Sequence, residues 1–527
     1  MQDRKFILAI SVAVVTFLTV PLGIAAQDST TRAKKAQHHH YKLIEIGTFG
    51  GPSSYFNNFY AGPFFDSGTV LIKRGTLAGW ADTSTPDPFP SLCLNPDCFV
   101  SHALQWHDDV LTDLGTLADG WGAQVTWIND TGDIVGLSQN GVIDPLIGFP
   151  EQRAVRWRHG QITDLGTLGG NQSVALSVNN HGQIAGLALN TIPDPFSIYD
   201  LLYFNSSSGT QTRAVLWDKD GSMQDLGTLG TGPDAYALLV NEGGQVTGWS
   251  YTNSIPNQTT NLPTFHPFLW QKGKGMQDLG TLGGTVAQAV NGLNERGEVA
   301  GATTLAGDQT HHAFLWDGKQ LIDLGTLGGD HSEAIWLNNA GEVVGGADYT
   351  AQCRPGVGGE HAFLWGKGAM TDLGTINGIP YSEADFINDK TQIVGNSFNC
   401  DFSTVDAFLW EKGSIVDLNS LLASKSSVHL AVGSYIDNQG EIAAIGVLPN
   451  GDGRAVLLIP CDENHPGIEG CDYSMVDAAE VANNAVAQRS PLAILPNMDS
   501  LARTINPSQN WFRQRYPLLG QRPPLRH

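Results

Sequence analysis

A five-residue phrase recurs along this chain and limits what the chain can fold into. The phrase Asp-Leu-Gly-Thr-Leu begins at Asp113, Asp164, Asp225, Asp278 and Asp323. A variant ending in isoleucine begins at Asp372, and degenerate copies begin at Glu45 and Asp417, so eight copies are present. Most copies follow a tryptophan, and these tryptophans are 45 to 60 residues apart. A period of this length is typical of repeat proteins whose unit is one small supersecondary structure.

The unit at residues 312–346 predicts four short strands joined by turns. The expected strands cover residues 312–316, 320–327, 332–337 and 342–346. Turn-forming residues separate them, at Asp317-Gly318, at Gly328-Gly329 and at Asn338-Asn-Ala-Gly341. Four strands in about 46 residues is the size of a propeller blade. The 62 glycines and the low charged fraction of 15% also favour an all-β protein.

The third strand of a unit carries a small residue four positions before the asparagine of its turn. These residues are Ala175, Ala237, Ala334 and Ala384. A small side chain suits the crowded strand beside a propeller axis. We therefore expect the strand order from the axis to be third, fourth, first and second.

The two ends of the repeat region are complementary halves of a unit. Residues 42–46 resemble only the second strand of a unit, and residues 454–458 resemble only the first. Pairing these segments would complete a blade and cover two sheet edges. The sequence therefore predicts a β-propeller of eight four-stranded blades over residues 42–460, closed by the N- and C-terminal strands.

The units resemble HAF repeats, a family of bacterial extracellular repeats named for His-Ala-Phe. That tripeptide occurs at His312-Ala-Phe and His361-Ala-Phe. Altered versions of it occur in other units, at His102-Ala-Leu, Arg153-Ala-Val and Asp406-Ala-Phe. The resemblance covers about residues 42–460. It implies export and a repeat fold, and it transfers no catalytic residue.

The first 26 residues have the form of a secretory signal peptide. Arg4 and Lys5 precede an apolar run, and small residues follow up to Ala26. We expect cleavage after Ala26, with Ala25 as the alternative, and contact with the membrane through the signal peptide alone. An uncleaved membrane anchor is the competing interpretation. The predicted location is therefore outside the cell or at its surface.

Two further segments flank the repeats. Residues 27–41 are expected to form a flexible linker. Residues 461–527 are expected to form a tail with one helix over residues 475–488 and a basic, proline-rich end at residues 489–527.

Charge and cysteine content limit the cellular compartment in which the protein is expected and the partners that it is expected to bind. The net charge is -23 although both ends are basic, so the repeat region is strongly acidic and is not expected to bind nucleic acid. Six cysteines fit an oxidising compartment. We expect Cys93–Cys98 and Cys461–Cys471 to close local loops, and Cys353–Cys400 to bridge neighbouring units.

A search for chemistry finds no catalytic or cofactor motif in this sequence. Because the aspartate of the repeated phrase occurs in nearly every unit, we expect it to anchor a turn. Residues His38, His39 and His40 precede the fold, so a metal site there is not expected. His312 and His361 are expected to pack or to cap strands. No cofactor is predicted.

Long links with aromatic residues are the predicted binding surface. In a meander the long links and the Gly-Gly links emerge on one face, opposite the short Asn-x-x-Gly turns. Tyr199, Tyr203, Phe204 and Tyr251 are the candidate contacts for an extracellular glycan or protein. The alternative is that these rings only pack the links.

These observations favour a secreted binding or scaffold protein of unknown ligand. The alternative is a secreted polysaccharide hydrolase or lyase that uses two carboxylates near the axis. The carboxylates considered for it are Asp66, Asp234, Glu333, Glu383 and Asp385. A purely structural envelope component is a third interpretation.

Overall fold

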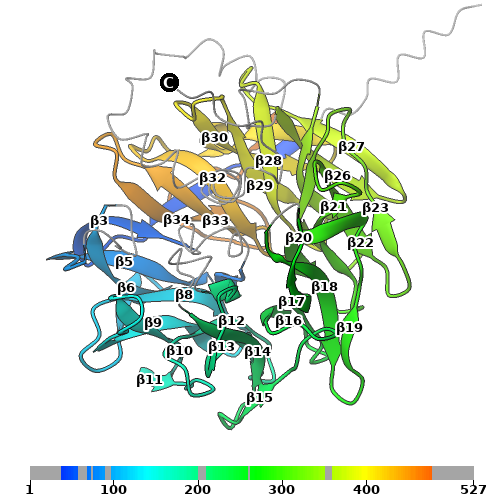
Figure 1. Ribbon diagram of the computed structural model, residues 1–527. Helices are drawn as coiled ribbons and strands as arrows, with labels where there is room; N and C mark the ends of the chain where they lie inside the picture. The colour runs from blue at the N-terminus through cyan, green and yellow to red at the C-terminus, as the bar shows by residue number, and fades with distance from the viewer. Residues whose placement is uncertain are drawn as a thin grey trace, which may run out of the picture. The chain divides into compact units, whose positions relative to one another are not determined.

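The computed structural model describes residues 37–56, 68–72, 75–89, 97–199, 209–258, 261–349 and 359–477. The described residues are dominated by β-strands, as expected (Figure 1). Among these residues, no helix is long and apolar enough to span a bilayer. The predicted signal peptide, the cleavage site at Ala26 and the basic tail end lie outside the described residues.

The strands form antiparallel four-stranded meanders in chain order. The first contains β3 (Gly50–Tyr55), β5 (Thr76–Pro86), β6 (Phe99–His107) and β7 (Val110–Gly115), and β4 (Leu71–Ile72) pairs with β5. The second contains β8 (Ala123–Ile128), β9 (Ile134–Ile143), β10 (Pro150–Arg158) and β11 (Gln161–Asp164). The third contains β12 (Ser173–Val178), β13 (Ile184–Pro193), β14 (Thr210–Trp217) and β15 (Met223–Asp225).

Two meanders in the middle of the chain are joined into one sheet. One contains β16 (Ala235–Val240), β17 (Val246–Pro256), β18 (Pro263–Gln271) and β19 (Gly275–Asp278). The other contains β20 (Gly283–Leu293), β21 (Val299–Leu305), β22 (His311–Trp316) and β23 (Leu321–Asp323). A parallel pair between Phe265 and Val286 connects them.

The C-terminal meanders follow the same pattern. One contains β24 (Ser332–Leu337), β25 (Val343–Asp348), β26 (Glu360–Gly366) and β27 (Ala369–Gly374). The next contains β28 (Tyr381–Ile387), β29 (Ile393–Phe398), β30 (Val405–Glu411) and β31 (Ser414–Asp417), and a short 3-10 helix, η2 (Leu418–Leu421), follows it. The last contains β32 (His429–Ile436), β33 (Ile442–Val447) and β34 (Gly453–Pro460), with β2 (Tyr41–Glu45) at its edge.

Strand order within each meander agrees with the order expected from the sequence. In the sheet β24-β25-β26-β27, the third and fourth strands of one repeat precede the first and second strands of the next repeat. Successive meanders contact one another through their first strands, for example β12 with β8 and β16. The third strand of the repeat is therefore innermost.

The N-terminal strand completes the last meander. β2 pairs with β34 in antiparallel register, with Leu43 opposite Leu458 and Glu45 opposite Val456. This is the pairing that the two half-units at residues 42–46 and 454–458 predicted. The last meander also contacts the first, because Ala455 donates its backbone N–H to Ser54 Oγ at 3.1 Å. Figure 1 shows β34 and β33 beside β3 and β5.

A β-bulge lies beside the small residue of the innermost strand, and it requires a glycine in the neighbouring strand. Ala175 lies opposite Gly186, and the register shifts between Ala175 and Ser177. A Cβ atom on Gly186 would lie 2.1 Å from the carbonyl oxygen of Val174, so glycine is required there. The same alanine–glycine pair and shift occur at Ala237 with Gly248. Close approach of two backbones at the bulge therefore accounts for the glycine opposite the alanine.

The repeated aspartate anchors a turn, as expected. Asp164 Oδ1 accepts the backbone N–H of Gly166 at 2.7 Å, and the equivalent bond recurs in five other copies, those that begin at Asp113, Asp225, Asp278, Asp323 and Asp372. In two copies, the same carboxylate also pairs with a histidine at the second position of the preceding strand. His312 Nδ1 lies 2.9 Å from Asp323, and His361 Nδ1 lies 2.9 Å from Asp372. These histidines therefore pair with the repeated aspartate of their own unit.

The segments beside the repeats correct two expectations. The linker was expected to extend to residue 41, but β1 (Gln37–His39) pairs with β35 (Met475–Asp477). His38 is buried and its Nδ1 lies 3.1 Å from Glu411 Oε1, so it belongs to the folded core. The helix expected from residue 475 is wrong at its start, because residues 475–477 are extended; its other residues lie outside the described residues.

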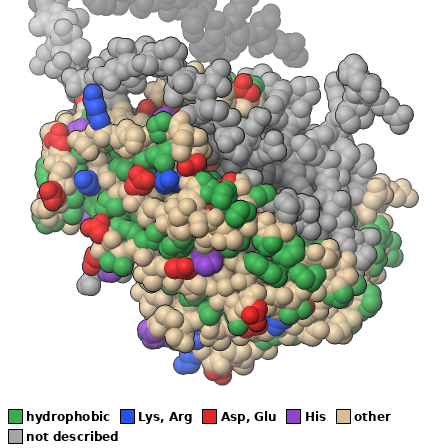
Figure 2. All heavy atoms as spheres, turned by 90° about the vertical axis from the view of Figure 1, so that its left-hand side faces the viewer, with side chains coloured by type: hydrophobic (Ala, Val, Ile, Leu, Met, Phe, Trp, Pro, Cys, Tyr) green, Lys and Arg blue, Asp and Glu red, His purple; other side chains and the backbone are tan. Residues whose placement is uncertain are grey.

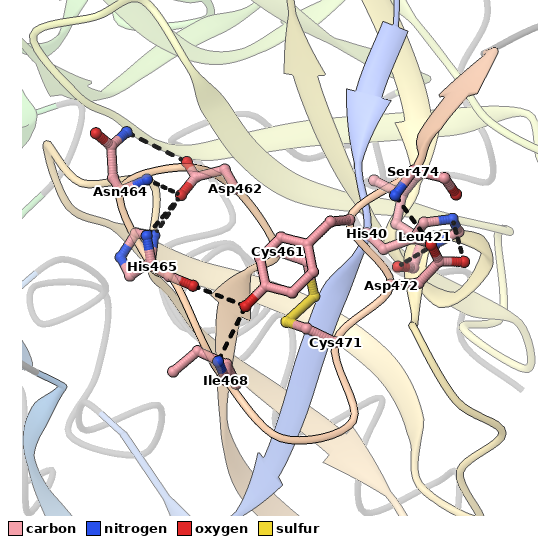
Figure 3. The surroundings of a disulfide bond; sticks show 11 residues. His40, Leu421, Cys461, Asp462, Asn464, His465, Ile468, Cys471, Asp472 and Ser474 are labelled. Carbon is pink, nitrogen blue, oxygen red and sulfur yellow. Dashed lines mark hydrogen bonds and ion pairs between the residues drawn. A yellow bond between two sulfur atoms is a disulfide. The ribbon is translucent and has the colours of Figure 1, made fainter.

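One predicted disulfide is confirmed. Cys461 and Cys471 are bonded and close the loop after β34 (Figure 3). Within this loop, Asp462 accepts from the backbone N–H groups of Asn464 and His465 and from the His465 imidazole. Cys98 and Cys400 also form disulfides. Cys93 and Cys353 lie outside the described residues, so the pairings with them stay predictions.

Candidate functional site

A cavity of about 410 Å³ lies where the turns after the innermost strands converge. Seven successive meanders contribute the end of their innermost strand and the turn that follows it. The first meander contributes Thr69, Leu71 and Ile72 instead. The cavity is therefore built from equivalent positions of the repeat and opens among the short turns.

A belt of asparagine side chains joins these turns. Asn179 Oδ1 accepts the backbone N–H groups of His181 and Gln183 and so closes its own turn. Its Nδ2 donates to the carbonyl oxygen of Asn241 in the next meander at 3.0 Å. Six such bonds run from Asn129 to Asp437, at 2.7 to 3.2 Å. These asparagines are buried, and each amide ties one meander to the next.

A second belt is formed by the residue after each asparagine, and after Asp437 in the last meander. From Asn180 onwards, its side-chain oxygen accepts the backbone N–H of the equivalent residue in the preceding meander. The residues in order are Asp130, Asn180, Glu242, Glu295, Asn339, Asp389 and Asn438. The bonds measure 2.9 to 3.1 Å. This rim of the cavity therefore contains four carboxylates and three amides.

Burial and neighbouring negative charges shift two acidic groups at the cavity. Burial raises the pKa of Glu295, and the charges of Glu242 and Asp389 raise it further. Burial also raises the pKa of Asp437, which takes the place of the asparagine in the last meander. His181 Nδ1 lies 3.1 Å from Glu242 Oε2 and faces that carboxylate from outside the lining. The rim thus concentrates negative charge at one opening.

Aromatic rings line the inner part of the cavity. Trp336 packs against Phe386 with ring centroids 4.7 Å apart, and Phe386 packs against Tyr435 at 4.3 Å. Trp127, from β8, approaches Trp336, from β24, with centroids 6.2 Å apart. Trp127, Trp336 and Tyr435 are only partly buried, so ring surface is accessible beneath the rim.

This arrangement can hold a small molecule or one side chain of a larger partner. A recess with apolar walls and a few oriented polar groups is the usual form of a ligand site. The described residues contain no group of three or more histidines, cysteines or acidic residues placed to hold a metal ion. The chemistry that the cavity offers is hydrogen bonding, negative charge and aromatic contact.

The aromatic residues expected to bind a ligand lie elsewhere. Tyr199 is buried and its hydroxyl donates to Gln152 Oε1 at 2.6 Å. Tyr251 is buried and its hydroxyl donates to the carbonyl oxygen of Phe196 at 3.0 Å. Tyr203 and Phe204 lie outside the described residues. Tyr199 and Tyr251 therefore pack the links in this structure, and a ligand site on the long-link face stays a prediction.

Of the carboxylates considered for catalysis, the four within the described residues are not part of the cavity lining. Asp234 is fully buried and accepts the backbone N–H of Ile198 at 2.7 Å. Burial and the neighbouring Asp194 charge raise its pKa. Glu333 lies in β24, and Glu383 and Asp385 lie in β28, all partly exposed. Asp66 lies outside the described residues.

Comparison with known proteins finds solved structures that resemble this chain in fold alone. No family model and no curated protein matches the chain. The β-propeller domain of the Trilobed protease from Pyrococcus furiosus is 8% identical, covers 69% of this chain and 95% of its own, and has a TM-score of 0.40. Dipeptidyl peptidase 4 of Porphyromonas gingivalis is 10% identical, covers 74% of this chain and 58% of its own, and has a TM-score of 0.40.

A polysaccharide lyase acting on ulvan is a third solved structure of this kind. It is 9% identical, covers 63% of this chain and 91% of its own, and has a TM-score of 0.32. TM-scores this low carry no argument about activity. The all-β propeller scaffold rests instead on the repeated meanders and their contacts.

The Asn-x-x-Gly turns were predicted to be ordinary turns, and the cavity among them was not predicted. The feature that could have revealed the cavity is the residue after the asparagine, because it carries a side-chain oxygen in successive units. A solvent-exposed turn accepts many residue types there, whereas a belt of hydrogen bonds needs an acceptor.

Proposed function

We propose that this protein is a secreted, eight-bladed β-propeller that binds a ligand in the cavity among the short turns. The eight copies of the phrase and the β2–β34 pairing support the blade count. The N-terminal signal pattern and the disulfide bonds support export. The mature chain is then the propeller with a C-terminal tail.

The cavity is the observation that carries the binding proposal. The two belts hold its rim rigid, since each turn is bonded both to itself and to the next meander. A preformed rim lowers the entropy lost when a ligand binds. Aromatic surface below the rim provides the apolar contact that such a site needs.

Crystals soaked with a mixed set of small fragments test this proposal. The set contains monosaccharides, neutral aromatics, carboxylates and organic amines. We expect fragments to occupy the cavity beside Trp336 and Phe386. Fragments confined to the long-link face would contradict the proposal and would favour the face expected from the sequence.

A matched pair of variants tests whether the fragments must enter the cavity to bind. Leu293→Trp adds a large side chain to the cavity lining, and Val110→Trp adds the same ring at an exposed position. Occupancy is expected to be lost in Leu293→Trp and retained in Val110→Trp. Equal occupancy in both variants would show that the fragments bind elsewhere.

A further inference from the structure

We propose that the ligand of this cavity presents an organic cation, a guanidinium or an ammonium group. This inference rests on the proposed function and names the chemical class that the same site takes. The group belongs either to a small molecule or to the basic side chain of a peptide. The cavity rim binds the charge, and the aromatic rings below it contact the attached carbon chain or the planar group.

All charged residues among the described residues of the cavity lining are acidic. Five acidic residues line the cavity: Asp130, Glu242, Glu295, Asp389 and Asp437. Among the described residues, no lysine, arginine or histidine lines it. An anionic ligand would meet this charge without a counter-ion, whereas a cation would neutralise part of it. The lining therefore selects against anions.

Glu295 keeps acceptor capacity for a ligand. Glu295 Oε2 accepts the Glu242 backbone N–H at 3.0 Å, and a carboxylate has about four acceptor sites. Glu242 and Glu295 are neighbours in the rim, and their mutual repulsion contributes to the raised pKa of Glu295. A bound cation between these two carboxylates would relieve that repulsion. Charge-assisted hydrogen bonds of this kind are stronger than neutral ones.

The aromatic floor suits a cation better than a neutral polar group. Cations are attracted to the faces of tryptophan, tyrosine and phenylalanine, and guanidinium also stacks on them. Trp127 and Trp336 approach each other from different meanders, and Phe386 and Tyr435 continue the aromatic wall. Carboxylates above aromatic rings form a site for a group with positive charge and apolar faces.

Isothermal titration with matched probes tests the inference. One pair is the peptide Ala-Ala-Arg-Ala-Ala and the same peptide with citrulline, the neutral isostere of arginine. Agmatine supplies a free guanidinium and ammonium without a peptide. We expect the arginine peptide or agmatine to bind at least about tenfold more tightly than the citrulline peptide. Which of the two cations binds identifies the source of the group.

Two double variants distinguish the effect of the rim carboxylates on binding from the effect of negative charge elsewhere on the surface. Glu242→Gln with Glu295→Gln removes two rim charges and keeps an oxygen for the belt bonds. Glu463→Gln with Glu469→Gln removes two exposed charges from the loop after β34. Cation affinity is expected to fall about tenfold or more in the first and to change less than about twofold in the second. Thermal unfolding of both variants checks that the fold is retained.

The outcomes distinguish the two proposals. Equal binding of the arginine and citrulline peptides, or no millimolar binding of any cation, overturns the cation inference. If neutral fragments then still occupy the cavity, the proposed function stands without it. If no probe enters the cavity and Leu293→Trp alters no binding, both proposals fail.

Discussion

At the scale of single residues, the turn asparagine joins two levels of structure. Its Oδ1 closes the turn of its own meander, and its Nδ2 donates to a carbonyl oxygen of the next meander. This short side chain can do both because a primary amide has an acceptor oxygen and two N–H donors. The repeat therefore uses one residue type for both local and long-range order. Asp437 has no such donor when ionised, so the last position of the belt differs from the others.

Asn241→Asp is expected to destabilise the protein by about 1 to 3 kcal/mol. The variant keeps the acceptor for the Gln245 backbone N–H but loses the donor to the buried carbonyl oxygen of Asn294. Chemical denaturation measures the free energy of unfolding. Asn253→Asp is the control, because its Oδ1 anchors a partly exposed turn at Ile255, and we expect a change below about 0.5 kcal/mol. Equal losses in both variants would contradict a special role for the belt.

At the scale of elements, β2 covers an edge that the last meander would otherwise expose. β34 pairs with β33 on one side and with β2 on the other. Without β2, the backbone groups of β34 that face it would be left without partners. The strand that closes the last meander thus comes from the other end of the chain.

Removal of β2 is expected to lower the melting temperature by at least about 10 °C or to prevent folding. Two truncated proteins separate β2 from β1. A chain beginning at Tyr41 retains β2, and a chain beginning at Gly47 lacks it. Differential scanning calorimetry compares them with the chain beginning at Gln27. Identical unfolding of the two truncated proteins would show that β2 does not hold the repeats together.

The contact between β1 and the end of β30 is expected to make stability depend on pH. Burial opposes ionisation of Glu411, but hydrogen bonds from His38 and Gln392 and the Lys412 charge outweigh burial and lower its pKa from 4.5 to about 2. A lowered carboxyl pKa stabilises the fold above the unfolded pKa, and this stabilisation is lost as pH falls from 4.5 towards 2.

Glu411→Gln is expected to remove this contribution, which is on the order of 1–3 kcal/mol. Urea denaturation at pH 7 and near pH 3 measures it in both proteins. The variant should lose less stability on acidification than the wild type. Parallel losses in the two proteins would assign the acid sensitivity to other carboxylates.

At the scale of the whole molecule, the repeats form a series in which every meander contacts the next and the last contacts the first. The loop closed by Cys461–Cys471 follows the final strand of this series. A rigid frame of equivalent turns leaves a cavity at their meeting point, whose character depends on the turn residues and on the aromatic residues at the ends of the innermost strands.

Peptide mapping of the exported, non-reduced protein is expected to recover Cys93–Cys98 and Cys353–Cys400 beside Cys461–Cys471. N-terminal sequencing of the same sample should begin at Gln27. Export from a bacterial host provides the oxidising compartment in which these bonds form. A free thiol at Cys353 would refute the bridge between neighbouring units, and an intact N-terminus would favour the membrane anchor.

The sequence by itself determined the strand pattern, the order of strands in a meander and the partner of the terminal strand. These follow from local periodicity, from turn residues such as Asp317-Gly318, and from half-units at residues 42–46 and 454–458. It also predicted the turn-anchoring role of the repeated aspartate, because a residue needed in every unit has a structural task.

Only the tertiary structure decided where a ligand can enter. Trp127 and Trp336 are 209 positions apart in the sequence, yet their rings lie 6.2 Å apart beneath the rim. Glu242 and Glu295 become rim neighbours because successive turns are brought together. Periodicity describes each unit separately, whereas a cavity depends on how the units meet. Burial of Tyr199 likewise follows from packing between units, which no single repeat reveals.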